Sequence, residues 1–129
     1  MKIFLGVIII LICGFFIITF YRGKTPATIK PPLGITFRSG FTGGVMQVHN
    51  TSSNKQMCYL TVFNDHSNQQ RNFSFAIEPN GTKELGVLEM DWHFDPYEYG
   101  YIVVDGYLGK IEFKIYNTIK EYTTKWTLK

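Results

Sequence analysis

The sequence predicts a mainly β protein, an antiparallel sandwich or barrel of seven short strands that follows one N-terminal transmembrane helix. Three observations lead to this expectation. The chain begins with a long uncharged apolar stretch, and short apolar runs then alternate with turn signals at intervals of about 8–12 residues. Aromatic residues make up 16% of the chain, and rings together with β-branched side chains favour strands.

The apolar stretch runs from Ile3 to Phe20 (IFLGVIIILICGFFIITF) and contains no charged residue. At a rise of about 1.5 Å per residue, a helix of this length spans roughly 27 Å, close to the ~30 Å hydrocarbon core of a bilayer. Tyr21 follows at the height that aromatic rings prefer, and Arg22 then ends the run. We therefore expect residues 1–22 to be a single-pass transmembrane segment that binds the chain to the membrane.

Two other N-terminal signals were weighed against this anchor. A cleaved signal peptide has a shorter apolar region and a small-x-small cleavage site, which the sequence lacks. A lipid-modified cysteine needs a small residue before it, whereas Ile12 precedes Cys13. An uncleaved signal anchor is favoured, but its flanking charges (Lys2 on one side, Arg22 and Lys24 on the other) do not decide which side the domain faces.

Three segments are expected after the anchor. Residues 23–33 (GKTPATIKPPL) contain three prolines and no periodicity, which predicts a stiff, extended linker. Residues 34–116 carry the strand pattern and form the sandwich. Residues 117–129 are polar and basic, and a loose end is favoured there over an eighth edge strand.

Alternating apolar residues bounded by turn residues mark each expected strand. In residues 57–64 (MCYLTVFN), for example, Cys58, Leu60 and Val62 share one face. The turn at Pro79-Asn80-Gly81 has a mechanism, because proline presets φ and Asn-Gly tolerates positive φ. The seven predicted strands are residues 35–38, 45–50, 57–64, 72–77, 82–88, 101–104 and 110–116.

Composition excludes several classes of function. The chain has 13 Lys and Arg against 10 Asp and Glu, and because these charges are interspersed there is no basic stripe for nucleic acid. Cys58 is the one cysteine outside the apolar stretch, so no disulfide is expected within the domain. No nucleophile elbow, P-loop, dinucleotide fingerprint or zinc-ligand spacing occurs, so we expect no enzyme, no cofactor and no metal.

Several short motifs in the domain resemble those of small bacterial proteins that combine a signal anchor with one immunoglobulin-like sandwich. The shared features are an Asn-Thr-Ser turn, a proline-glycine turn, a Gly-x-Leu-Glu sequence before a tryptophan, and a late Gly-Tyr. Here these positions are Asn50, Thr51, Ser52, Pro79, Gly81, Gly86, Leu88, Glu89, Trp92, Gly106 and Tyr107. The resemblance covers roughly residues 34–116, and it implies an immunoglobulin-like fold on the extracytoplasmic side of the membrane, without a known activity.

The most unusual segment is residues 89–101 (EMDWHFDPYEYGY), where aromatic and acidic residues alternate. One interpretation, the favoured one, is a crossover that plugs one end of the sandwich with Trp92 and Phe94. The other is an interaction loop, because aromatic rings give large contact area at low entropy cost. The candidate interaction residues are Trp92, Phe94, Tyr97 and Tyr99. A calcium site through Asp91, His93 and Asp95 was also weighed, although no EF-hand spacing is present.

The sequence thus predicts a membrane-tethered, non-enzymatic β-sandwich module that takes part in protein–protein interaction at the cell envelope. An exposed sheet edge or the aromatic loop would contact the partner protein, whose identity the residues do not indicate. The alternative is a domain that binds envelope glycans or calcium.

Overall fold

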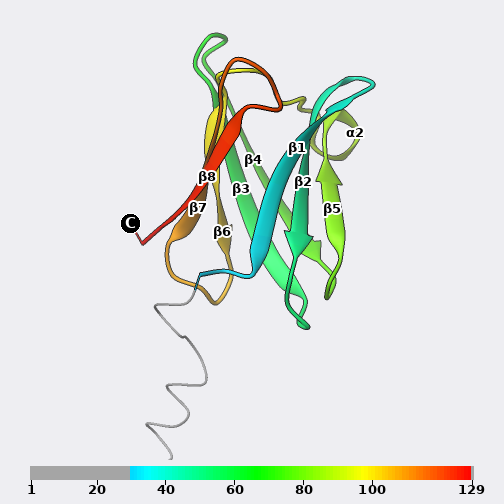
Figure 1. Cartoon of the computed structure of the whole chain (residues 1–129), viewed down its shortest axis with the longest axis vertical. Coiled ribbons are helices and arrows are strands. Elements are labelled where there is room, and N and C mark those ends of the chain that lie inside the picture. Colours follow the sequence, from blue (N-terminus) through cyan, green and yellow to red (C-terminus); the bar gives the residue numbers. More distant parts are fainter. Residues whose placement is uncertain (1–29, 129) are drawn as a thin grey trace, which may run out of the picture.

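The computed structural model describes residues 30–128, which form two antiparallel β-sheets packed face to face (Figure 1). One short helix, α2, lies between β5 and β6. The elements in chain order are β1 (Leu33–Gly40), β2 (Gly43–Asn50), β3 (Gln56–Asn64), β4 (Gln69–Ile77), β5 (Thr82–Leu85), α2 (Val87–Met90), β6 (Tyr99–Val104), β7 (Lys110–Ile115) and β8 (Tyr122–Thr127).

The strands divide unequally between the sheets. The small sheet has the order β1-β2-β5, and the large sheet has the order β4-β3-β6-β7-β8. Every pairing is antiparallel, and the chain changes sheet between β2 and β3, between β4 and β5, and between β5 and β6. Because β1 begins and β2 ends at the same end of the sandwich, we call that end proximal to the N-terminus and the opposite end distal (Figure 1).

The core lies between the two sheets and follows the alternation of the strands. Along β3, Cys58, Leu60 and Val62 are buried, while the residues between them face outward. The small sheet contributes Met46 and Val48, which are also fully buried. Each such side chain stabilises the fold by about 1.5–3 kcal/mol through the apolar surface it removes from water. Burial also raises the pKa of the Cys58 thiol to about 12.

A buried asparagine fastens the proximal end. Asn50, at the end of β2, donates through Nδ2 to the carbonyls of Asn54 (2.7 Å) and Ile77 (3.2 Å), and its Oδ1 accepts from the Ser52 amide (2.9 Å). These contacts satisfy a polar side chain that has no exposed surface, as burial requires. They also join the small sheet to β4 of the large sheet, which explains the Asn-Thr-Ser turn.

The structure corrects three boundary predictions. The predicted loose end contains β8, which pairs with β7 along Tyr122–Thr127, so there are eight strands and the domain extends beyond residue 116. The strand expected over residues 82–88 stops at Leu85, because Gly86 leads into α2. The sequence also missed α2, since one helical turn is too short to show a helical period.

The remaining N-terminal prediction lies outside the described residues. The transmembrane segment expected over residues 1–22, and most of the linker expected over residues 23–33, precede Lys30, where the description begins. Within residues 30–128, none of the helices has the length and apolar character that crossing a bilayer would require.

Candidate recognition surface

The predicted interaction loop crosses the distal end of the sandwich from β5 to β6. It starts with α2, where the Gly86 amide donates to Glu89 Oε1 at 2.8 Å. At its centre, the Phe94 amide donates to the Gly44 carbonyl at 3.0 Å, which attaches the loop to β2. A Cβ atom on Gly44 would lie 2.1 Å from the Phe94 carbonyl oxygen, so only glycine permits this approach.

Two of the four predicted interaction residues are buried in the core. Trp92 is 8% exposed and Phe94 is 1% exposed. The Phe94 ring packs edge-on against Phe37, with ring centroids 5.4 Å apart, and near Phe113 at 6.3 Å. This burial agrees with the favoured interpretation, a crossover that plugs one end of the sandwich with Trp92 and Phe94. The alternative, an interaction loop, is corrected at these two positions, because both rings are part of the core.

Glu98 holds the end of the loop and is itself 1% exposed. Its carboxylate accepts from Trp92 Nε1 at 3.0 Å and from Asn64 Nδ2 at 2.6 Å. Burial raises the pKa of Glu98, and the two hydrogen bonds offset part of that rise. Neither donor is charged, so the Glu98 carboxylate forms no ion pair here. It connects Trp92 to Asn64 on β3 through two hydrogen bonds. In the sequence, Glu98 is one of several acidic residues of residues 89–101, and nothing there distinguishes it as the buried one.

The other two predicted residues, Tyr97 and Tyr99, are exposed by 53% and 37%. The Tyr97 hydroxyl donates to the Asn117 side chain, and the Tyr99 hydroxyl donates to Asp65 Oδ1 at 3.0 Å. The hydrogen bond to Asp65 raises the pKa of Tyr99. Tyr99 is the first residue of β6, so its ring belongs to the outer surface of the large sheet as well as to the distal end.

A groove of about 560 Å³ crosses the outer surface of the large sheet over β6, β7 and β8. We call its ring-bearing and lysine side chains the aromatic–lysine face: Phe63, Tyr99, Tyr101, Tyr116, Lys110, Lys114 and Lys125. The strand registers explain the grouping, because Phe63 pairs with Tyr99, and Tyr99 pairs in turn with Lys114. Aromatic side chains thus gather on β3 and β6, and lysines gather on β7 and β8.

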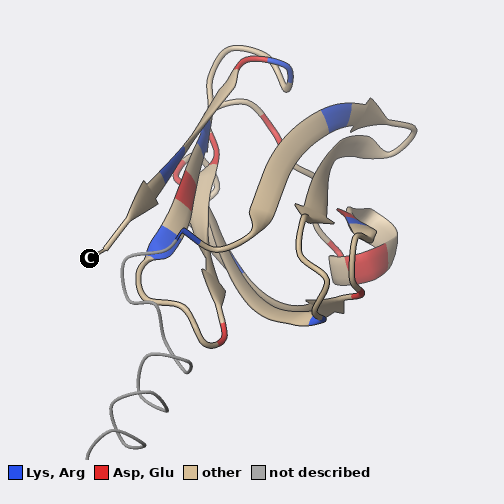
Figure 2. Ribbon diagram, turned by 60° about the horizontal axis from the view of Figure 1, so that its bottom comes forward, with Lys and Arg blue, Asp and Glu red and all other residues tan. Residues whose placement is uncertain are grey.

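The charges of this face are unbalanced. Lys110 Nζ lies 4.5 Å from the centre of the Tyr101 ring and 3.6 Å from Glu112 Oε1. Lys114 Nζ lies 5.3 Å from the Tyr116 ring, and neither Lys114 nor Lys125 forms an ion pair with a described carboxylate. Figure 2 shows blue segments, with red between them, on the strands next to the C label.

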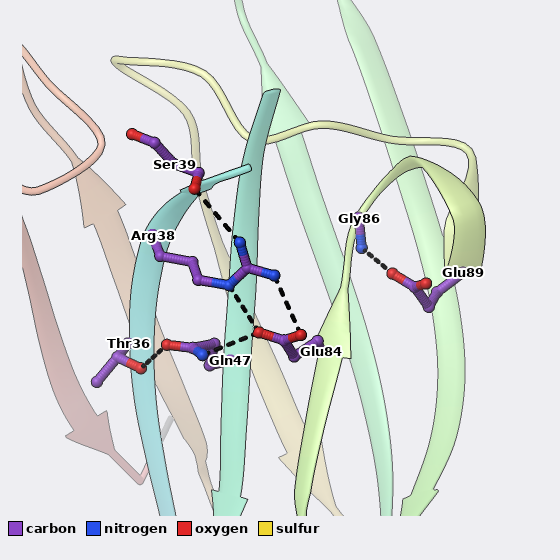
Figure 3. A network of polar contacts seen from close by, with 7 residues as sticks. All are labelled: Thr36, Arg38, Ser39, Gln47, Glu84, Gly86 and Glu89. Atoms are coloured by element: carbon purple, nitrogen blue, oxygen red, sulfur yellow. Dashed lines mark hydrogen bonds and ion pairs between the residues drawn. The ribbon is translucent and has the colours of Figure 1, made fainter. Parts of the chain in front are cut away.

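The outer surface of the small sheet has a different character (Figure 3). Arg38 donates to both carboxylate oxygens of Glu84, from Nε at 2.7 Å and from Nη2 at 3.1 Å. Gln47 Nε2 donates to Glu84 at 2.9 Å, and Thr36 donates to Gln47 at 3.1 Å. The contact with Arg38 lowers the pKa of Glu84. This surface satisfies its own charges and offers a partner little to neutralise.

The structure does not group the three side chains of the alternative calcium site. His93 Nε2 lies 3.1 Å from Asp95 Oδ2, but the Asp91 carboxylate points toward Arg71, with the closest atoms 3.9 Å apart. Within residues 30–128, no three acidic, histidine or cysteine side chains are grouped so that they could hold a metal ion.

The chain was compared with family models, with curated proteins and with solved structures, and no match was found in any of the three.

The alternation of residues in β6 and β7 is the sequence signal for the aromatic–lysine face. In β6 (YGYIVV) and β7 (KIEFKI), the residues that alternate with the buried positions are Tyr99, Tyr101, Val103, Lys110, Glu112 and Lys114. Alternation alone indicates that these side chains share the outward direction. Alternation does not indicate that β6 pairs with β7 in this register. That pairing is what brings the lining residues of the groove together.

Proposed function

We propose that this protein is a membrane-tethered, non-enzymatic, immunoglobulin-like module that binds another protein at the cell envelope through its aromatic–lysine face. The single observation that carries the proposal is the contrast between the two outer surfaces. The outer surface of the small sheet pairs Arg38 with Glu84, whereas the large sheet presents a groove with exposed rings and with Lys114 and Lys125, which form no ion pair with a described carboxylate. Aromatic rings are enriched where proteins bind partners.

The tether and the finer fold class are supported by separate observations. The apolar stretch from Ile3 to Phe20 is long enough to cross a bilayer. In chain order, the first, second and fifth strands share one sheet, and the third, fourth, sixth and seventh share the other. An immunoglobulin-like sandwich groups its strands in this way when the fourth strand pairs with the third. The disulfide of antibody domains has no counterpart, since Cys58 is free.

The packing of the rings favours a protein over a glycan as the partner. Phe63 and Tyr99 lie nearly parallel, with centroids 5.2 Å apart and planes inclined by 20°, so each ring covers a face of the other. The Lys110 ammonium covers one face of Tyr101. Sugars stack on open ring faces, whereas peptide side chains also pack against ring edges. The glycan alternative therefore has less support than the protein alternative.

Site-specific photo-crosslinking in cells tests this proposal. A benzophenone amino acid would replace Thr123, which lines the groove, or Thr36 on the outer surface of the small sheet. We expect the Thr123 variant of the full chain to form a discrete adduct with one protein, and the Thr36 variant to form none. Equal adducts from both positions, or none from either, would contradict the proposal.

A further inference from the structure

We propose that the aromatic–lysine face binds an extended acidic segment of its protein partner, in which two carboxylates occupy positions i and i+2. This inference rests on the proposed function and names the chemistry of the partner. It follows from where the unpaired ammonium groups lie, and from the side chains between and beside them.

Lys114 and Lys125 form the cationic end of the face. Lys114 lies on β7 opposite Thr123, and Lys125 lies two residues further along β8. Residues in this diagonal relationship are about 7–8 Å apart. In an extended peptide, side chains at i and i+2 point the same way and are about 6.6 Å apart. The spacing of two alternate residues in the peptide is therefore close to the spacing of the two lysine residues on the sheet, and the flexible lysine side chains can reach both carboxylates.

The third lysine of the face is already balanced. Lys110 lies 3.6 Å from Glu112, and Glu112 is the one acidic residue among those that line the groove. Glu112 also lies opposite Lys125 in the pairing of β7 with β8, although these two side chains form no ion pair. Three lysines against one glutamate leave the groove with two net positive charges. A partner that supplies two carboxylates neutralises the face, whereas a neutral or basic partner leaves these charges unmatched.

The rings select a peptide rather than a bare anion. Tyr99 and Tyr101 lie on β6, directly beside β7, and they form an apolar wall along the lysines. In an extended segment the side chains at i−2 and i+4 point the same way as the two carboxylates, so they can pack against these rings, whereas a bare anion carries no such side chain. The attraction between the lysines and the two carboxylates thus positions the acidic segment on the sheet, and the tyrosines contribute the apolar contact.

The test uses the full chain in an uncharged detergent and a fluorescent synthetic peptide that contains one Glu-Thr-Glu sequence between neutral residues. We expect this peptide to bind, and its affinity to fall as sodium chloride is raised. The matching Gln-Thr-Gln peptide should bind far more weakly. Fluorescence polarisation reports both affinities.

Charge reversal locates the site. Lys114→Glu and Lys125→Glu should each weaken binding of the Glu-Thr-Glu peptide by about tenfold, since each change replaces an attraction by a repulsion. Lys83→Glu is the matched control, because Lys83 is an exposed lysine on the small sheet. The double reversal at positions 114 and 125 should gain affinity for a Lys-Thr-Lys peptide, which a misfolded variant would not do.

Several results would overturn this inference. One is equal binding of the Glu-Thr-Glu and Gln-Thr-Gln peptides, and another is an equal loss in the Lys83→Glu control. A polyuronate that binds in a Lys114-dependent way while the peptide does not would identify a glycan as the occupant. If photo-crosslinking from Thr123 succeeds and the peptide fails, the acidic-segment inference fails alone. If both fail, the proposed function fails with it.

Discussion

At the scale of single residues, Glu98 connects the crossover to the large sheet at the distal end. It is a fully buried carboxylate whose partners, Trp92 and Asn64, are neutral donors. An ionised group in such a place costs free energy unless hydrogen bonds replace its lost water. Both hydrogen bonds are present, yet burial outweighs them, and the pKa of Glu98 lies above its ordinary value.

The sign of the pH dependence follows from that direction. The folded pKa exceeds the unfolded value of about 4.3, so the native state binds more protons than the unfolded chain between these two values. The contribution of Glu98 to the free energy of unfolding is therefore fully present below pH 4.3, and it is lost as pH rises through the folded pKa.

The variant Glu98→Gln tests this effect. Its amide nitrogen faces the Asn64 donor, which costs roughly 1–3 kcal/mol at every pH. The cost of ionisation is absent, however, so we expect the stability deficit of the variant to shrink between pH 4 and pH 8. Urea denaturation followed by tryptophan fluorescence measures the deficit. A deficit that stays constant over this range would show that Glu98 does not titrate as the structure indicates.

At the scale of elements, β8 converts a four-stranded sheet into a five-stranded one and covers the core from one side. Tyr122 packs edge-on against Phe37, with ring centroids 5.1 Å apart. Trp126 packs against the core, and its Nε1 donates to the Leu108 carbonyl at 3.4 Å. The loose end expected from the polar composition was wrong because these rings alternate with Thr and Lys residues that face water.

Truncation of the Trp126 side chain measures how much β8 contributes to the free energy of unfolding. Fully buried tryptophans lose about 3–5 kcal/mol on replacement by alanine, and Trp126 is partly exposed, so we expect Trp126→Ala to lose roughly 2 kcal/mol. Leu128→Ala, two residues further on and 59% exposed, should change stability by less than about 0.5 kcal/mol. Equal effects of the two substitutions in thermal unfolding would argue that β8 is only loosely attached.

At the scale of the whole molecule, the proposal joins a recognition face to a tether. We expect the full chain to remain in the membrane pellet after extraction with alkaline carbonate, because residues 3–20 are apolar and long enough to span. A variant that lacks residues 1–24 should appear in the supernatant. Release of the full chain by carbonate would show that this stretch does not anchor it.

Orientation is tested by the same full chain. A periplasmic-active reporter fused after Lys129 should be active, since the domain is expected on the extracytoplasmic side. A cytoplasmic-active reporter in the same place provides the matched control. Activity of the cytoplasmic reporter alone would place the domain on the other side of the membrane, and the envelope partner would then be excluded.

The mainly β class and most of the strands can be inferred from the order of residues in the chain. In β3, for example, Cys58, Leu60 and Val62 alternate with outward residues, and this local period directly records which side chains meet the core. Turn residues such as Pro79-Asn80-Gly81 similarly mark where a strand must end, because they set backbone angles within a few residues.

Only the tertiary structure decided which of these residues act together. Phe63 and Tyr99 are distant in the chain and become neighbours because β3 pairs with β6, and Lys114 approaches Lys125 because β7 pairs with β8. It also decided that Trp92 and Phe94 are core residues, since the same rings in a loop can point inward or outward. Periodicity reports the direction of a side chain, whereas a binding surface depends on strand order and register, which arise from contacts between distant segments.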